Sequence, residues 1–284
     1  RRPKEQPSGD KGWEGADLLL RDLTSDTMLN FGNVHEFGFN KSGRWLSMTI
    51  DAQHQTGNGI VLLEVDASKL RTLDTDKAEY RRLAWTQDGD ALSLLKGVKS
   101  DDHEKKLYEL LGYHHLDADK PQLLHIVPEK DAGIPESMTI SPNRTPQWTD
   151  DRSGLVFGIH DAGKKDTNKD EDAEEPKEGQ ADDEADVVVW HWEDKRLQSQ
   201  QQVQESQDKS FSYLCIRQTE AEKTLRLGTE EMREASIPRP HRIAIATDNE
   251  MYRRDGSLDG RRYRDVYVVD ISSGQRRLVL ELSL

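Results

Sequence analysis

Short apolar runs alternate with polar turns along most of this chain. One recurring segment is an apolar strand, a tight polar turn and a returning strand. Runs of β-branched and apolar residues bounded by Asp, Ser and Gly predict β-hairpins. Four segments have this form: 18–23 with a turn at 24–26, 60–65 with a turn at 66–68, 211–217 returning through 224–227, and 266–271 with a turn at 272–274.

A second recurring segment joins an aromatic residue, a polar turn and a short apolar strand. Residues 39–47 match residues 85–93, with Gly, Leu and Ser in register 46 positions apart. A looser third copy runs from Trp148 to Gly158. Repetition of this kind is the strongest signal in the sequence, because fixed-period similarity marks repeat architectures.

The two segments alternate, which pairs hairpins at a spacing of roughly 40 to 60 residues and predicts four-stranded blades. We therefore expect an all-β fold, a partial β-propeller of about four to five antiparallel blades, since blades bury their faces by packing on one another. Residues 102–111 and 194–206 are the best helix candidates. They are short or almost wholly polar, so no amphipathic helix is predicted.

Composition divides the chain into three parts. Hydrophobic and charged residues each make up 33%, with a net charge of −14. Residues 161–186 hold 12 Asp/Glu against 4 Lys, a net of −8, and should form a disordered acidic insertion in a blade. We expect a flexible tail at 1–14 and a propeller domain or fragment over 15–284.

Charge and hydropathy exclude several partners. An acidic chain without a basic stripe argues against nucleic acid, and no apolar run reaches the roughly 20 residues that span a bilayer, so no membrane insertion is predicted. The first residue is Arg1 instead of Met, which indicates that an upstream segment is removed. The compartment stays open, with a periplasmic or secreted location favoured over the cytoplasm. Cys215 is the only cysteine and lies in an apolar run, so we expect a buried side chain.

Four motifs were tested for chemistry. Residues 166–170 open like a calcium loop, but Glu171 and Lys177 replace the required Gly and Glu. Residues 256–260 place a serine one position too early for a nucleophile elbow. His114 and His115 should point to opposite faces if they lie in a strand, so they cannot share one metal unless the strand breaks there. Trp190, His191 and Trp192 predict a strand buried on both faces. The sequence therefore predicts no catalytic, cofactor-binding or metal-binding residue, and no cofactor.

Two charged clusters leave alternatives open. Glu230, Glu231 and Arg233 match a grip for a peptide amino terminus, although surface charges of this kind are common. The residues at 252–254 and 261–264 form a basic, aromatic cluster that either faces the acidic insertion or a partner domain, or lies solvated in a loop.

The aromatic repeats at Phe39, Trp85 and Trp148 resemble the aromatic-Ser-Pro-Asp-Gly-Lys-x-Leu motif of TolB-like propellers, without its proline in the first two copies and with a different turn in the third. Together with residues 80–85, 187–202 and 263–267, the chain resembles, over about 15–284, the amino-terminal propeller of bacterial prolyl oligopeptidase family serine peptidases. That resemblance implies a propeller that caps an α/β-hydrolase domain and restricts entry to peptides. The family's catalytic Ser, Asp and His lie in the hydrolase domain, so none is carried over.

Three hypotheses follow. The first is a non-catalytic propeller part of a serine peptidase, a scaffold and substrate-access filter whose partners are peptide substrate and the α/β-hydrolase domain of the same polypeptide. The alternative is a free-standing TolB-like propeller that mediates protein–protein interaction. A third, an enzyme with its site in the central channel, needs clustered carboxylates or histidines that the sequence does not show. The last residues, 280–284, lie on a hairpin's return strand, which favours a fragment with fewer blades than a closed ring.

Overall fold

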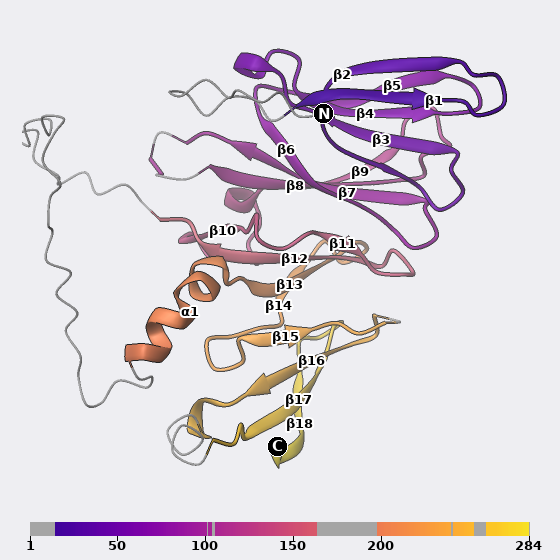
Figure 1. Ribbon diagram of the computed structural model, residues 1–284. Helices are drawn as coiled ribbons and strands as arrows, with labels where there is room; N and C mark the ends of the chain where they lie inside the picture. Colours follow the sequence, from indigo (N-terminus) through magenta and orange to yellow (C-terminus); the bar gives the residue numbers. More distant parts are fainter. Residues whose placement is uncertain are drawn as a thin grey trace, which may run out of the picture.

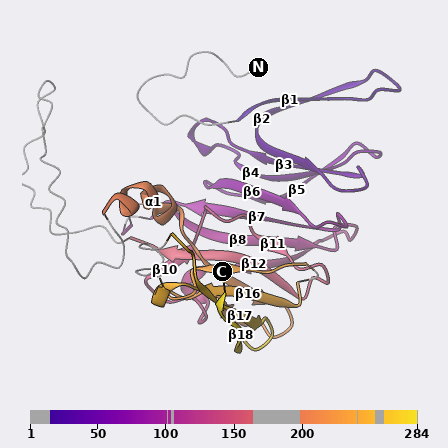
Figure 2. The same cartoon turned by 60° about the horizontal axis from the view of Figure 1, so that its bottom comes forward.

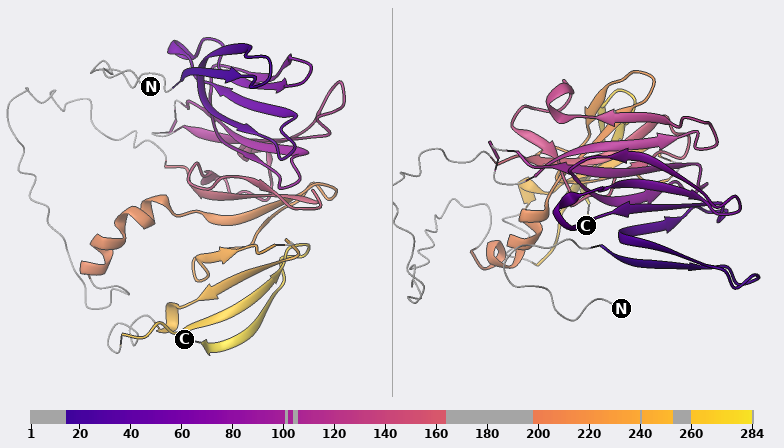
Figure 3. Two further views of the ribbon diagram at one scale, coloured as in Figure 1. Left: turned by 45° about the vertical axis from the view of Figure 1, so that its right-hand side comes forward. Right: turned by 90° about the horizontal axis from the view of Figure 1, so that it is seen from above.

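The described strands form four antiparallel sheets that follow one another in chain order (Figure 1). The computed structural model describes residues 15–100, 102–103, 106–163, 198–239, 241–252 and 260–283. The sheets are stacked face to face, from the indigo sheet at one end to the yellow sheet at the other, and the stack does not close on itself (Figures 1 and 3). The sheets are the blades of a β-propeller, which confirms the predicted fold class.

The blades are numbered here from the amino-terminal end of the stack. Blade 1 contains β1 (Ala16–Arg21), β2 (Met28–Phe39), β3 (Trp45–Ile50), β4 (Gly59–Glu64) and β5 (Lys69–Thr75). Blade 2 contains β6 (Glu79–Trp85), β7 (Ala91–Val98), β8 (Leu107–His114) and β9 (Gln122–Ile126). Blade 3 contains β10 (Met138–Ile140), β11 (Gln147–Trp148), β12 (Gly154–Asp161), β13 (Tyr213–Gln218) and β14 (Thr224–Arg226). Blade 4 contains β15 (Glu234–Ser236), β16 (Ile243–Asp248), β17 (Arg264–Asp270) and β18 (Arg276–Ser283).

All four predicted hairpins are present, as β1–β2, β4–β5, β13–β14 and β17–β18. Within the residues that the structure describes, the helical elements are few and short. They are α1 (Gln198–Ser210) and three 3₁₀ turns, η1 (Gln53–Gln55), η2 (Pro128–Lys130) and η3 (Glu250–Tyr252).

Buried side chains fill the spaces between neighbouring blades, because successive residues of a strand point to opposite faces. In β7, Leu92 and Leu94 pack toward blade 1, while Ala91 and Leu95 pack toward blade 3. Fully burying a leucine side chain contributes roughly 1.5–3 kcal/mol. Strands such as β7 therefore read as continuous apolar runs, and they hold two neighbouring blades together.

The aromatic repeats all form the same turn. The residue after the aromatic donates its backbone N–H to the carbonyl of the residue five positions later. Its own carbonyl accepts the backbone N–H of the residue three positions later. These bonds are Asn40 to Trp45 (2.9 Å) and Gly43 to Asn40 (3.0 Å), Thr86 to Ala91 (2.9 Å) and Gly89 to Thr86 (3.0 Å), and Thr149 to Gly154 (2.8 Å) and Arg152 to Thr149 (3.0 Å).

The turn requires a left-handed residue. Gly43 and Gly89 have φ of 76°, a conformation that glycine adopts at no steric cost. Arg152 takes the same place in the third copy at φ 60°. The third copy therefore has a different residue at this position but the same left-handed backbone conformation.

Blade 4 carries a partial fourth copy of the turn, with only the second of the two bonds, because Pro238 has no N–H to donate. His241 has φ 60° and donates its N–H to the Pro238 carbonyl (2.9 Å), as the turn glycines do in blades 1 and 2. Ile237 stands where the other copies have an aromatic residue. Consecutive turns also contact one another through Asn40 and the Gly89 carbonyl (2.8 Å), Arg152 and Asp90, and His241 and the Asp150 N–H (3.3 Å).

The β1–β2 hairpin lies over the face of blade 1 that points away from blade 2. Its side chains Leu18, Leu20 and Phe31 pack against Leu46 and Met48 of β3. The register of β2 against β3 shifts between residues 34 and 37, where the strand leaves the hairpin for the blade. Figure 2 shows this hairpin above β3 and β4 at the amino-terminal end of the stack.

Blade 3 is interrupted between two paired strands. Phe157 of β12 is opposite Cys215 of β13, although 58 positions separate them. Helix α1 lies in this connection and overlaps the polar candidate at 194–206. Val203 is its one apolar residue, so it is a polar helix and not an amphipathic one. Within the described residues, no helix is long and apolar enough to span a bilayer. The other helix candidate, at 102–111, overlaps strand β8.

Several sequence predictions fall outside the described residues. They are the tail at 1–14, the acidic insertion beyond Gly163, the calcium-like segment at 166–170, the strand with Trp190, His191 and Trp192, and residues 256–259 of the serine-containing segment.

Candidate functional site

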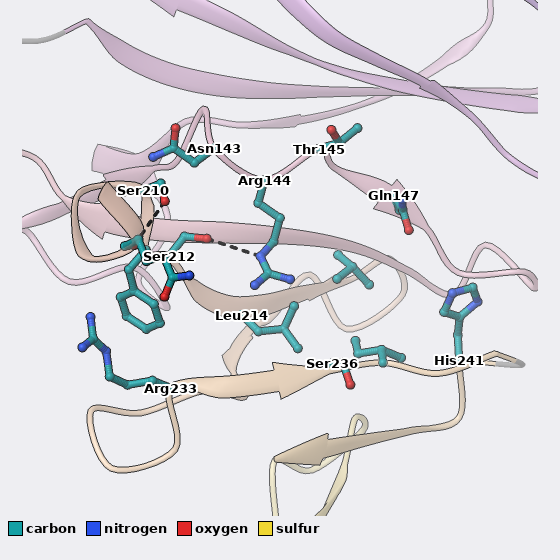
Figure 4. Close-up of a pocket in the computed structure, with 14 residues that line it drawn as sticks. Asn143, Arg144, Thr145, Gln147, Ser210, Ser212, Leu214, Arg233, Ser236 and His241 are labelled. Atoms are coloured by element: carbon teal, nitrogen blue, oxygen red, sulfur yellow. Dashed lines mark hydrogen bonds between the residues drawn. The ribbon is translucent and has the colours of Figure 1, made fainter. Parts of the chain in front are cut away.

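The segment that joins β10 to β11, residues 141–146, carries Arg144. It is fixed to blade 2 on one side, and Arg144 extends in the other direction, toward blade 4 (Figure 4). Three hydrogen bonds make the attachment: Arg82 Nε to the Pro142 carbonyl (2.7 Å), Ser93 Oγ to the Pro146 carbonyl (2.8 Å) and Trp148 Nε1 to the Leu92 carbonyl (3.0 Å).

Arg144 extends into a pocket of about 570 Å³ between blades 3 and 4. Ligand pockets in proteins commonly measure about 300–1,000 Å³. The wall combines an apolar strip, Val156, Leu214 and Ile237, with side chains that donate hydrogen bonds. The polar lining residues are Asn143, Arg144, Thr145, Gln147, Gln207, Ser210, Ser212, Arg233, Ser236 and His241.

The charge of this lining is opposite to that of the chain. The sequence holds 54 Asp and Glu against 40 Lys and Arg. The described residues that line the pocket include two arginines and no carboxylate. An electropositive concavity in an acidic protein selects anions by attraction inside and repulsion outside.

The two arginines differ in their partners. Arg233 is neutralised by Asp208, with 3.2 Å between Nη1 and Oδ1, and its guanidinium lies over the ring of Phe211 at 4.0 Å. Arg144 makes no ion pair with any residue in the described part of the chain. Its hydrogen-bond partner is Ser212, whose Oγ accepts from Nε at 3.3 Å.

Burial lowers the pKa of the Arg144 guanidinium below its usual value, and no nearby carboxylate offsets the effect. An arginine stays protonated in proteins in spite of such shifts. Arg144 therefore presents a half-buried positive charge to the pocket, without a counter-ion among the described residues.

Gly158 of β12 makes the position of Arg144 possible. A Cβ at this residue would lie 2.5 Å from Ser212 Oγ and 3.1 Å from Arg144 Cβ. Contacts under 3.0 Å do not occur without a shift of the neighbouring atoms. The absence of a side chain at Gly158 thus provides the space in which Arg144 and Ser212 meet.

His241 lies at the rim of the pocket and also belongs to the fourth turn (Figure 4). Its Nδ1 accepts the Asp150 backbone N–H at 3.3 Å and lies 3.4 Å from Asp150 Oδ2. The imidazole therefore links the repeated turns of blades 3 and 4 at the edge of the pocket.

The histidine pair selected from the sequence has a different geometry from the one predicted. β8 ends at His114, and His115 has φ 54°, so the two rings lie 4.6 Å apart instead of on opposite faces. The strand ends between them, which is the condition under which the sequence allowed the two rings to come together. In the described part of the chain, no three His, Cys, Asp or Glu side chains are grouped to hold a metal ion.

Cys215 is fully buried, as predicted, and burial raises the pKa of its thiol to about 12. A thiolate is the reactive form of cysteine, so this residue is inert at neutral pH.

The charged clusters are occupied by internal contacts. Glu230 accepts a hydrogen bond from the Tyr213 hydroxyl, and Arg233 pairs with Asp208. Tyr252 donates its hydroxyl to Asp265 at 2.9 Å, and its ring lies 6.4 Å from that of Tyr263. Residues 253–254, the remainder of the first basic segment, lie outside the described residues.

Sequence reasoning missed Arg144, Ser212 and His241. The only local signal is that Pro142 and Pro146 bracket Arg144, which marks a rigid polar loop without naming its role. The unpaired charge arises from the assembly of blades 3 and 4, which no short motif encodes.

No protein-family model matches the chain. No curated protein matches it. Among solved structures, it is similar to TolB from Acinetobacter baumannii (9% identity, TM-score 0.37), covering 96% of this chain and 53% of TolB. It is similar to the β-propeller domain of the Trilobed protease from Pyrococcus furiosus (9%, 0.43), covering 93% and 62% of the two chains. It is also similar to an acylaminoacyl peptidase from Pyrococcus horikoshii (9%, 0.40), covering 93% and 34%.

The chain is a β-propeller segment. It spans about half the length of TolB and about a third of that of the acylaminoacyl peptidase. The propeller assignment rests on its own four blades and on the turn that all of them share.

Proposed function

We propose that this segment is the non-catalytic propeller part of a prolyl oligopeptidase-like serine peptidase. It acts as a scaffold and substrate-access filter for an α/β-hydrolase domain of the same polypeptide. The observation that supports this role is the exposed apolar surface at both ends of the blade stack, which requires further protein to cover it.

At the amino-terminal end, Phe37 and Phe39 of β2 are 56% and 47% exposed. They lie opposite Met48 and Leu46, and residues directly opposite in a sheet share a face. That face is the one turned away from blade 2, and the β1–β2 hairpin covers only part of it.

At the other end, Leu280 of β18 is 54% exposed and lies opposite Val266, on the face of blade 4 turned away from blade 3. Clustered apolar side chains on a soluble protein mark surfaces that bind other protein. A propeller placed beside a second domain uses such surfaces for contact, and this is consistent with a role as a scaffold.

The proposed filtering role is supported by the pocket between blades 3 and 4. The pocket of blades 3 and 4 presents hydrogen-bond donors beside an apolar strip, a lining suited to an extended peptide. The segment handles peptide, and the bond-breaking groups belong to the partner domain.

The direct test is to read the coding sequence beyond Leu284. We expect an α/β-hydrolase domain with a Gly-x-Ser-x-Gly elbow after a strand. A reading frame that stops near Leu284 would overturn the peptidase role and leave a free-standing interaction module.

A second test uses fluorophosphonate, which labels activated serines. The longer polypeptide should be labelled in its hydrolase domain, and this segment alone should not be labelled. Labelling of a serine within this segment would contradict the non-catalytic role. Heat-denatured protein supplies the control for non-specific reaction.

A further inference from the structure

We propose that the pocket between blades 3 and 4 binds the carboxylate of a peptide, with the Arg144 guanidinium as its ionic partner. The inference deepens the proposed function and rests on it for the peptide nature of the ligand. It names the chemical group by which this propeller selects a chain segment.

The unpaired charge of Arg144 is the first argument. Removing a guanidinium from water costs free energy unless an opposite charge and hydrogen bonds replace the solvent. Two other partly buried arginines have a carboxylate partner, since Arg217 lies 3.1 Å from Asp131 and Arg233 lies 3.2 Å from Asp208, and Arg71 and Arg226 donate to backbone carbonyls. Arg144 is left without a carboxylate partner at the wall of a pocket, where a ligand supplies the missing charge.

The geometry of the guanidinium is the second argument. Its Nε donates to Ser212 Oγ at 3.3 Å, which fixes the orientation of the planar group and leaves both terminal Nη groups for a ligand. Two parallel N–H donors match the two oxygens of a carboxylate. The loop that carries Arg144 is held from behind by hydrogen bonds to blade 2, so the group is positioned before a ligand arrives.

The rest of the lining indicates a peptide instead of a small inorganic anion. Arg144 offers a single uncompensated charge, which matches a carboxylate and falls short of a phosphate dianion. A volume of about 570 Å³ exceeds what one small anion fills. The apolar strip of Val156, Leu214 and Ile237 accommodates a hydrophobic side chain, and the amides of Asn143 and Gln147 can pair with peptide groups.

Two sources of carboxylate have this chemistry, the carboxyl terminus of a peptide and an Asp or Glu side chain. The test titrates this chain with three fluorescein-labelled pentapeptides and measures anisotropy. The first ends in leucine with a free carboxylate, the second is its amide, and the third is the amide with one internal glutamate.

We expect the free acid to bind, and the plain amide to bind at least about tenfold more weakly, since it lacks the charged acceptor. If the glutamate peptide binds as well as the free acid and depends on Arg144, the proposal holds with a side chain as the source. If the plain amide equals the free acid, or if inorganic phosphate binds and no peptide does, the proposal is overturned.

Arg144→Gln should reduce binding of the free acid about tenfold or more, because it removes the charge and the two-pronged donor. Arg144→Lys should recover only part of the affinity, since an ammonium is a point charge. The control is Arg277→Gln, which removes the same charge from an exposed position of β18 and should change affinity by less than about twofold.

Melting curves of each variant report whether it is folded. Folded Arg144→Gln that binds like the unaltered chain would overturn the proposal. A reading frame that stops at Leu284 would instead overturn the peptidase role while leaving the binding result intact, so the two failures are distinguishable.

Discussion

Blade 3 has two neighbours, and the spaces on its two sides are filled in different ways. Toward blade 2 lie large buried side chains, among them Trp148, Phe157 and Leu95, in one apolar cluster. Toward blade 4 the core is built partly on Ala244 and Ala246, and a polar pocket opens beside it.

A single strand serves both spaces. In β13, Cys215 points into the core shared with blade 2, while Leu214 points toward blade 4 and lines the pocket. The alternation of strand side chains lets one blade contribute stability on one face and binding on the other. Repeated blades therefore need not have equivalent interfaces. Each of the following predictions tests that difference.

The largest loss of stability should come from Trp148→Ala. The indole is 4% exposed, packs against Gly112 and donates to the Leu92 carbonyl. Truncating a buried tryptophan costs about 3–5 kcal/mol. Urea unfolding measures the change, with Trp85→Ala as the control, since Trp85 is only half-buried and also donates one hydrogen bond. Equal losses at the two positions would contradict the dense packing between blades 2 and 3.

A matched leucine pair compares the two spaces directly. Leu95 of blade 2 points into the space between blades 2 and 3 and is fully buried. Leu214 of blade 3 is 2% exposed and lines the pocket between blades 3 and 4. Leucine truncations cost about 2–5 kcal/mol, depending on the cavity that remains. We expect Leu95→Ala near the upper part of that range and Leu214→Ala near its lower end, because the pocket can hold water at the vacated site. The same urea experiment measures both, and a larger loss for Leu214→Ala would reverse the comparison.

Gly158→Ala should have an intermediate effect of about 1–3 kcal/mol, since overpacking moves neighbouring side chains. Its methyl group would meet Ser212 and Arg144. Gly38→Ala is the control, because there the nearest neighbour is Trp85 at an ordinary 3.5 Å. Thermal unfolding distinguishes the two. A harmless Gly158→Ala would show that Arg144 is not held as tightly as the contacts indicate.

Arg144→Leu should change stability least, within about 1 kcal/mol of neutral and toward stabilisation, because it replaces an uncompensated charge with an apolar side chain. The pocket would then have lost its charge without loss of fold. Urea unfolding checks the value, beside Arg217→Leu, which breaks the pair with the buried Asp131 and should be clearly destabilising. A loss for Arg144→Leu as large as for Arg217→Leu would show that Arg144 is a structural residue.

Much of the fold could be predicted from the sequence because hairpins are local. Apolar runs around turns at 66–68 and 272–274 determine their own pairing, and Gly43 and Gly89 mark left-handed turn positions. The fourth turn escaped detection because Ile237 and His241 replace the aromatic residue and the glycine. Its backbone is imposed by the contacts of blade 4.

The site could not be predicted in the same way. Arg144 and Ser212 are 68 positions apart and meet only when β12 and β13 pair across the interruption of blade 3. The absence of a counter-ion is a property of the assembled pocket. Neither fact is written in a short stretch of sequence.

The central claim is that the blade 3–blade 4 space binds carboxylate where the blade 2–blade 3 space only packs. The most direct measurement is a crystal structure of the chain with the leucine-terminated free-acid pentapeptide. The account predicts both carboxylate oxygens within hydrogen-bond distance, about 2.7–3.2 Å, of the Arg144 Nη groups. A peptide bound elsewhere, with Arg144 contacting only water and Ser212, would contradict it.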